Sequence, residues 1–187
     1  MIINERETRK EYLLSVAKQM MTAARTAPKG KGIDIIEIAT VAGEDEIQKL
    51  SALTREKGEE TGMKFMLRDS ENILLADVIV LIGSRTQVQA LNCGYCGVPT
   101  CAEKLQHDAM PCAINMVDLG IAVGSAVATA ADLRVDTRIM FSVGFAIKEM
   151  GYLPDCHSIY AIPVSASSKN PFFDRKPREQ QEQKKEI

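Results

Sequence analysis

The chain has 187 residues, of which 45% are apolar and 5% aromatic, and its formal net charge is −2. This length and apolar content predict one domain with a sizeable core. The weakly acidic balance and the scarcity of aromatic rings argue against a basic, base-stacking surface, so we expect no nucleic-acid partner. We predict a single domain over residues 1–166 and a polar, flexible tail over residues 167–187, where apolar residues become rare.

The first quarter of the chain predicts a helix, a strand and a second helix. Apolar residues recur with a period of 3.6 over residues 4–27, and Asn4 with Glu7 has the spacing of a capping box. Residues 33–41 are rich in isoleucine, which is typical of a strand, and residues 44–58 predict a short helix.

The next segment predicts two strands. Residues 63–67 alternate between polar and apolar and read as a strand, after which Asp69 or Ser70 caps a single turn. Residues 77–82 are almost continuously apolar, as in a central strand covered on both faces. A cysteine-rich segment follows this strand, where open α/β sheets gather ligands beyond the carboxyl ends of their strands.

Residues 114–131 predict a buried apolar helix. Only thirteen residues separate Asp118 from Asp132, fewer than the roughly 20 that cross a bilayer, so we expect no membrane span. Small residues recur every four positions along two stripes of this helix. They favour close packing within the chain, or a homodimer formed through residues 114–131.

The last part of the domain predicts one more helix and one more strand. Asp136 is placed to cap a helix over residues 137–150 that is apolar nearly all round and therefore central. Residues 158–164 predict a last strand, and Pro163 either places this strand at a sheet edge or ends its pairing. Together the elements predict an α/β fold, with α+β as the alternative. It would be a three-layer sheet with helices on both faces and the cysteine-rich loop after a central strand.

Residues 92–112 carry four of the five cysteines, spaced C-x2-C-x4-C-x10-C. Glycines that directly follow two of the cysteines permit positive φ, which lets backbone N–H groups turn toward sulfur. Dense cysteines on a polar loop predict a metal site, and this spacing alone allows a [4Fe–4S] cluster, structural zinc or incidental thiols. The candidate ligands are Cys93, Cys96, Cys101 and Cys112.

The segment CGYCGVPTC resembles the core of the four-cysteine cluster domain of electron-transport and corrinoid-protein subunits, in which the fourth cysteine comes later. The stretch from Pro111, with its D-L-G-I-A-x-G-S-A motif, is similar to an uncharacterised prokaryotic family of ferredoxin-domain-containing proteins. These resemblances imply a [4Fe–4S] cluster on the four loop cysteines. Cys156 is the substitute for the fourth ligand, and His107 and His157 are further donors.

A weaker likeness, in AARTAPKG and in the order of elements, is to flavin-dependent nitroreductases. It implies bound FMN, with the phosphate near Arg6 and Arg9, although the R-S-x-R pattern of those enzymes is absent.

We therefore predict an iron–sulfur protein of electron transfer or redox chemistry, working with a redox partner protein or a flavin. One alternative is a structural zinc-binding interaction module. Another is a nitroreductase-like flavoenzyme with an accessory cluster, and any enzyme activity would be that of an oxidoreductase. Five cysteines without a recognisable secretory leader predict the reducing cytoplasm.

Overall fold

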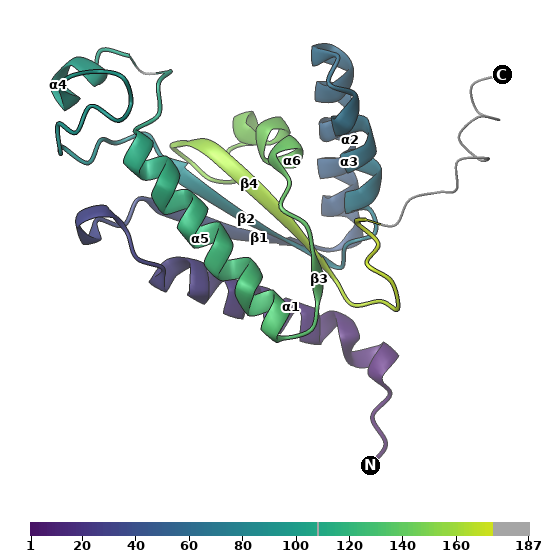
Figure 1. Cartoon of the computed structure of the whole chain (residues 1–187). Coiled ribbons are helices and arrows are strands. Elements are labelled where there is room, and N and C mark those ends of the chain that lie inside the picture. The colour runs from purple at the N-terminus through teal and green to yellow at the C-terminus, as the bar shows by residue number, and fades with distance from the viewer. Residues whose placement is uncertain (108, 174–187) are drawn as a thin grey trace.

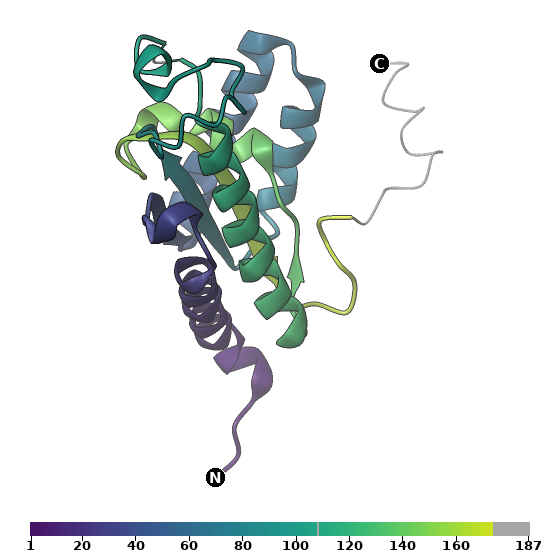
Figure 2. The same cartoon turned by 60° about the vertical axis from the view of Figure 1, so that its left-hand side comes forward.

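A four-stranded sheet forms the middle layer of the protein, in a computed structural model that describes residues 1–107 and 109–173. The strand order is β1-β2-β4-β3, and every neighbouring pair is antiparallel. Helices cover both faces of the sheet (Figures 1 and 2). The strands are β1 (Ile36–Ala42), β2 (Val78–Arg85), β3 (Asp136–Thr137) and β4 (Cys156–Ser165).

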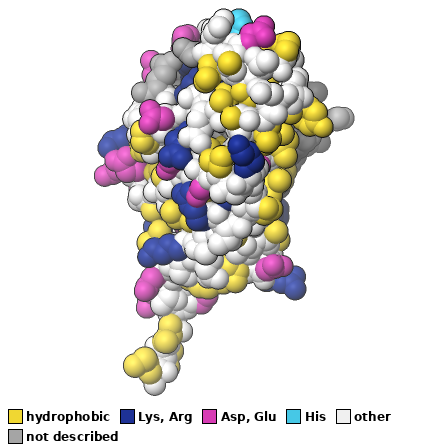
Figure 3. All heavy atoms as spheres, turned by 90° about the vertical axis from the view of Figure 1, so that its left-hand side faces the viewer, with side chains coloured by type: hydrophobic (Ala, Val, Ile, Leu, Met, Phe, Trp, Pro, Cys, Tyr) yellow, Lys and Arg dark blue, Asp and Glu magenta, His cyan; other side chains and the backbone are white. Residues whose placement is uncertain are grey.

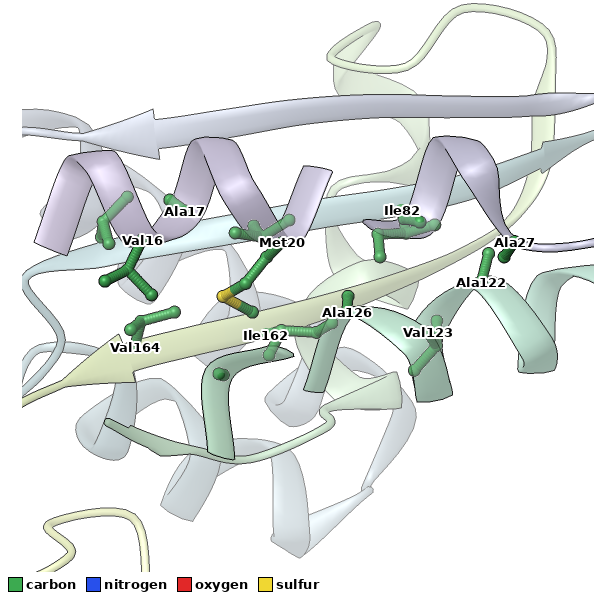
Figure 4. Packing of buried hydrophobic residues seen from close by; sticks show 14 of the residues in the cluster. Val16, Ala17, Met20, Ala27, Ile82, Ala122, Val123, Ala126, Ile162 and Val164 are labelled. Carbon is green, nitrogen blue, oxygen red and sulfur yellow. The ribbon is translucent and has the colours of Figure 1, made fainter. Parts of the chain in front are cut away.

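One face of the sheet packs against α1 (Glu5–Thr26) and α5 (Ala113–Asp132). Val16 and Met20 of α1 point toward Val164 and Ile162 of β4 (Figure 4). Ala126 lies on the inner stripe of α5, whose small side chains let α1 and α5 approach each other closely.

The opposite face packs against α2 (Glu44–Thr61), α3 (Lys64–Ile73) and α6 (Phe141–Ala146). Alternate residues of β2 point to opposite faces: Val80 and Ile82 join the α1/α5 core, while Ile79 and Leu81 join this second core. A strand buried on both sides must be apolar at every position, which explains the continuous apolar run. Phe172 packs into the second core from beyond residue 166.

The predicted three-layer α/β architecture is confirmed, with β2 as a central strand before the cysteine-rich loop. The helices predicted at residues 4–27, 44–58 and 114–131 correspond to α1, α2 and α5. Asn4 caps α1 as expected, because its side-chain oxygen accepts the N–H of Arg6 at 3.1 Å. Because the sheet is antiparallel, the rule for ligands at parallel strand ends does not apply to it.

The strand predicted at residues 63–67 is wrong, because this segment begins α3. Met66, Ser70 and Ile73 are buried at helical spacing, and α3 packs against α2. Asp69 caps nothing; it lies inside α3, where its Oδ2 accepts the hydroxyl of Ser142 at 2.6 Å. Five alternating residues were too short a window to distinguish the two periods.

The helix predicted at residues 137–150 is also wrong over much of its length. Asp136 and Thr137 form β3 against the end of β4, and Met140 makes an isolated bridge to Ala161. Helix α6 begins only at Phe141, which is 48% exposed, so this segment is not buried all round. A short 3-10 helix, η2 (Lys148–Met150), follows and ends at Gly151 (φ 70°).

Strand β4 is internal, although Pro163 predicts an edge. Proline has no backbone N–H to donate. At position 163 that N–H would point away from β2, because Ala161, two residues earlier, forms its backbone hydrogen bonds with Met140 on that side. There β4 is paired only with Met140 and with two-residue β3, and Pro163 falls between these contacts. The proline therefore interrupts no ladder with β2.

Helix α5 is the one helix among the described residues that is long and apolar enough in composition to cross a membrane. Its inner face packs on α1 and β2, and the buried carboxylate of Asp118 accepts the N–H of Gly30 at 2.9 and 3.0 Å. Gly30 belongs to the 3-10 turn η1 (Gly30–Gly32). The outer face of α5 is exposed at Val117 and Ile121, so the helix is only half-buried.

Candidate functional site

The cysteine-rich loop projects from one end of the layers, next to the N-terminal end of α5 (Figures 1 and 2). Polar contacts fix its exit from β2. The Asn115 side-chain amide donates to the carbonyls of Arg85 and Gln87, and Lys31 Nζ donates to the carbonyl of Gln89 at 3.1 Å. The first residues after β2 are therefore held against α5 and η1.

The tip of the loop is built from tight turns. Gly94 and Gly97 have φ values of 69° and 85°, in the region that favours glycine, and Gly97 N–H bonds the Gly94 carbonyl at 2.9 Å. Asn92 ties the two ends of the tip together. Its N–H donates to Cys101 Sγ at 3.3 Å, and its side-chain oxygen accepts the N–H of Cys101 at 2.8 Å.

The four predicted ligands differ in exposure. Cys93 is exposed, and Cys96 and Cys101 are half-buried. Cys101 opens the short helix α4 (Cys101–Lys104), whereas Cys112 is buried and is the N-cap residue of α5. The N-terminus of this 20-residue helix carries partial positive charge, so Cys112 lies at the positive end of α5.

The structure does not bring these thiols to one point. Within residues 1–107 and 109–173, no three His, Cys, Asp or Glu side chains are arranged to hold a metal ion. The set of donors nevertheless fits a four-thiolate cluster: three lie on an exposed, glycine-hinged loop and the fourth begins the next helix. Metal binding is coupled to the folding of the segment that supplies the ligands, so the loop would have to rearrange to bring the four thiols together. The ligand assignment stays a prediction.

The other predicted donors lie apart from the loop tip or within the fold. Cys156 begins β4 and is packed in the second core, where burial and then the charge of Glu37 raise the pKa of its thiol to about 11. His107 is exposed. His157 Nδ1 is shielded from solvent and has no hydrogen-bond partner within residues 1–107 and 109–173, and burial lowers the pKa of its imidazole.

Lys104 lies in the loop helix and is 3% exposed, with no carboxylate partner among the residues that the structure describes. A buried cation so close in sequence to Cys101 offsets negative charge in the loop. Neither Asn115 nor Asp118 was identified from the sequence as an anchor of the loop. Their signal was two polar residues three positions apart in the apolar first half of α5.

A second site lies at the other end of α5, where a cleft of about 600 Å³ borders the start of α1. Three guanidinium groups line it, from Arg6, Arg9 and Arg134, together with the hydroxyls of Ser167 and Ser168. Among the described residues, Glu5 is the one carboxylate that lines the cleft, and it is paired with Arg9 at 2.6 Å. The excess of positive charge and the two hydroxyls suit a phosphate or another anion.

Solved structures with a similar arrangement of elements include nitroreductases with bound FMN. A nitroreductase with bound FMN from Bacteroides fragilis superposes with a TM-score of 0.59 at 11% identity, covering 87% of this chain and 82% of that one. NfrA2 of B. megaterium gives a TM-score of 0.54 at 14% identity over 88% of this chain. The chain spans only 61% of NfrA2. The fold is thus nitroreductase-like.

The sequence relationship is more specific. An uncharacterised protein of Archaeoglobus fulgidus is 40% identical over 186 residues, covering 95% of this chain and all of the relative. Residues 108–175 match the family described as uncharacterised proteins containing a ferredoxin domain. The chain belongs to this family, as its sequence motifs predict.

Proposed function

We propose that this protein is an iron–sulfur redox protein whose loop, residues 92–112, binds one [4Fe–4S] cluster for electron transfer. The observation that carries the proposal is the placement of the thiols. Cys93, Cys96 and Cys101 lie on an exposed, hinged loop, and Cys112 lies at the positive end of α5. Membership of a ferredoxin-domain family supports the same chemistry.

The surroundings of the loop would tune such a cluster. Electron transfer adds negative charge to the thiolate-bound cluster, and nearby N–H donors and cations stabilise the reduced form. The N–H group of Gly94, the first turn of α5 and buried Lys104 would supply that stabilisation. Exposure of the loop tip would let a redox partner protein or a flavin approach. The protein would work in the cytoplasm, where thiols stay reduced.

Anaerobic reconstitution with iron and sulfide tests the proposal. We expect about four iron and four sulfide per chain, the content of one such cluster, together with visible absorption. Cys93→Ser and Cys96→Ser should lose that absorption, whereas Cys156→Ser, in the second core, should keep it. A colourless protein with one zinc per chain would favour the structural zinc module instead. Full cluster content in Cys93→Ser would contradict the ligand assignment.

A flavoenzyme is the second candidate function, and the arginine-lined cleft favours it. In this candidate Arg6, Arg9 and Arg134 would hold the FMN phosphate, with the cluster as an accessory redox group. Titration of metal-free protein with FMN, followed by flavin fluorescence, should show saturable binding. Arg6→Ala combined with Arg134→Ala should abolish it. Arg55→Ala, which removes an exposed arginine of α2, should not.

We also propose a homodimer formed through residues 114–131. Its support is the outer face of α5, where Val117 and Ile121 are exposed and a Cβ on Gly120 or Gly124 would meet no atom within 4 Å. Val117→Glu should then convert a dimer to a monomer in sedimentation measurements. A wild-type chain that sediments as a monomer would refute the dimer.

A further inference from the structure

A separate cavity of about 240 Å³ opens between α5, α6 and the start of β4. Its walls are apolar: Met116 lies on one side, and the Phe141 and Phe145 rings lie on another, 5.5 Å apart and tilted by 31°. Gly144 lines it as well, with α6 lying so close to β4 that a Cβ there would be 1.9 Å from the carbonyl oxygen of Ile159.

The polar lining of this cavity comprises Lys148, His157 and the hydroxyl-bearing Ser158 and Tyr160. Nδ1 of His157 is itself shielded from solvent and has no hydrogen-bond partner in the part of the chain that the structure describes. Burial lowers the pKa of His157, and the charges of Lys148 and Lys104 lower it further, so positive charge surrounds the ring. No carboxylate lines the cavity among the described residues. An oxygen anion placed here would lie beside the Lys148 ammonium group and within reach of the two lining hydroxyls.

The size of the cavity limits the ligand. A water molecule occupies about 30 Å³ of liquid, so the cavity holds the equivalent of roughly eight waters. This is below the range of about 300–1,000 Å³ typical of sites for drug-sized ligands and cofactors. Flat aromatic walls and a basic end therefore select a single ring with one acidic group.

We propose that this cavity binds a small aromatic carboxylate, with the ring against Phe141, Phe145 and Met116 and the carboxylate at Lys148 and His157. The site goes beyond the proposed redox function, because none of its contacts needs a metal. It nevertheless adjoins the cysteine loop: the N–H of Met116 donates to the carbonyl of Cys112 at 3.1 Å. A ligand in the cavity thus touches the helical turn that carries the fourth cysteine.

Benzoate is the probe, and the metal-free protein is the sample, so the result does not depend on a cluster. In a titration followed by amide and imidazole NMR signals, benzoate should produce saturable shifts centred on Gly144, Met116 and His157. Acetate, which lacks the ring, and benzyl alcohol, which lacks the charge, should each bind at least tenfold more weakly.

Two pairs of variants locate the site. Met116→Trp fills the cavity and should abolish saturable binding, whereas Leu14→Trp, on the exposed side of α1, should leave it unchanged. Lys148→Met should weaken benzoate binding several-fold, and Lys64→Met, an exposed lysine of α3, should not. Because Lys148 is also exposed, its replacement tests the site even if Met116→Trp fails to fold.

Three outcomes would overturn the proposal. The first is the absence of saturable shifts at millimolar benzoate. The second is a set of shifts centred on the arginine-lined cleft at Arg6 and Arg134 instead of on α6. The third is that Lys148→Met binds benzoate with unchanged affinity and that the parent protein binds benzyl alcohol as tightly as benzoate. The carboxylate would then contribute nothing to binding.

Discussion

Replacing Gly144 by alanine should push α6 away from the sheet. A Cβ at Gly144 would lie 1.9 Å from the carbonyl oxygen and 2.5 Å from the carbonyl carbon of Ile159, where ordinary contact begins at 3.4 Å. The obstacle is backbone, which cannot rotate away, so the helix itself must move. Overpacking costs about 1–3 kcal/mol and sometimes more, while replacing a helical glycine returns about 0.5–1 kcal/mol. We expect a net loss of about 2 kcal/mol.

Gly120→Ala is the matched control, since Gly120 also lies in a helix but a Cβ there meets no atom within 4 Å. It should stabilise the protein by about 0.5–1 kcal/mol. Urea unfolding followed by circular dichroism measures both variants, and the melting temperature of Gly144→Ala should fall by about 4–8 °C. If Gly144→Ala were as stable as the parent protein, the close approach of α6 to β4 would be wrong.

Two further predictions concern buried polar groups. Asp69→Ala should cost about 3 kcal/mol, because it leaves the buried Ser142 hydroxyl and the half-buried Arg138 without their carboxylate; a loss under 1 kcal/mol in urea unfolding would contradict this. The raised pKa of Cys156 makes its thiolate about 100-fold scarcer at pH 8 than the ordinary value of 9.0 would allow. Iodoacetamide should therefore label Cys93 long before Cys156 in metal-free protein, with the difference lost in denaturant. Because the folded state keeps the Cys156 proton longer, stability should fall as pH rises from about 9 to about 11, and Cys156→Ala should flatten that slope.

The elements predicted correctly from the sequence are those with a pattern of apolar residues that is local and extends over many positions. Helix α1 repeats its apolar period over several turns, and β2 is apolar from Val78 to Ile82 because both of its faces are covered there. The place of the cysteine-rich loop followed directly, since a loop after a central strand must emerge at the end of the sheet. The identity of the candidate ligands also came from the sequence, because thiol chemistry depends on residue type.

The structural features that the sequence did not predict depend on contacts between residues far apart in the chain. Strand β3 exists only because Asp136 and Thr137 meet Ser165 and Val164, which no local window reveals. The arginine-lined cleft joins residues 6 and 9 to residues 134, 167 and 168, and the apolar cavity joins residue 116 to residues 141–160. Such sites are made by chain folding and leave no motif. Whether the four thiols come together also depends on how the chain folds, so the residue types of the ligands do not predict it.

The strand order has a consequence for how the chain matures during synthesis. Strand β2 pairs with β1, which precedes it, but its other edge is completed by β4, whose first residue is 71 positions beyond the end of β2. Such non-local pairing slows folding, and domains emerge from the ribosome N-terminus first. All four loop cysteines are therefore synthesised before the sheet can close. The nascent chain would expose free thiols beside a mostly apolar strand with one edge unpaired, which makes a cellular chaperone useful at that stage.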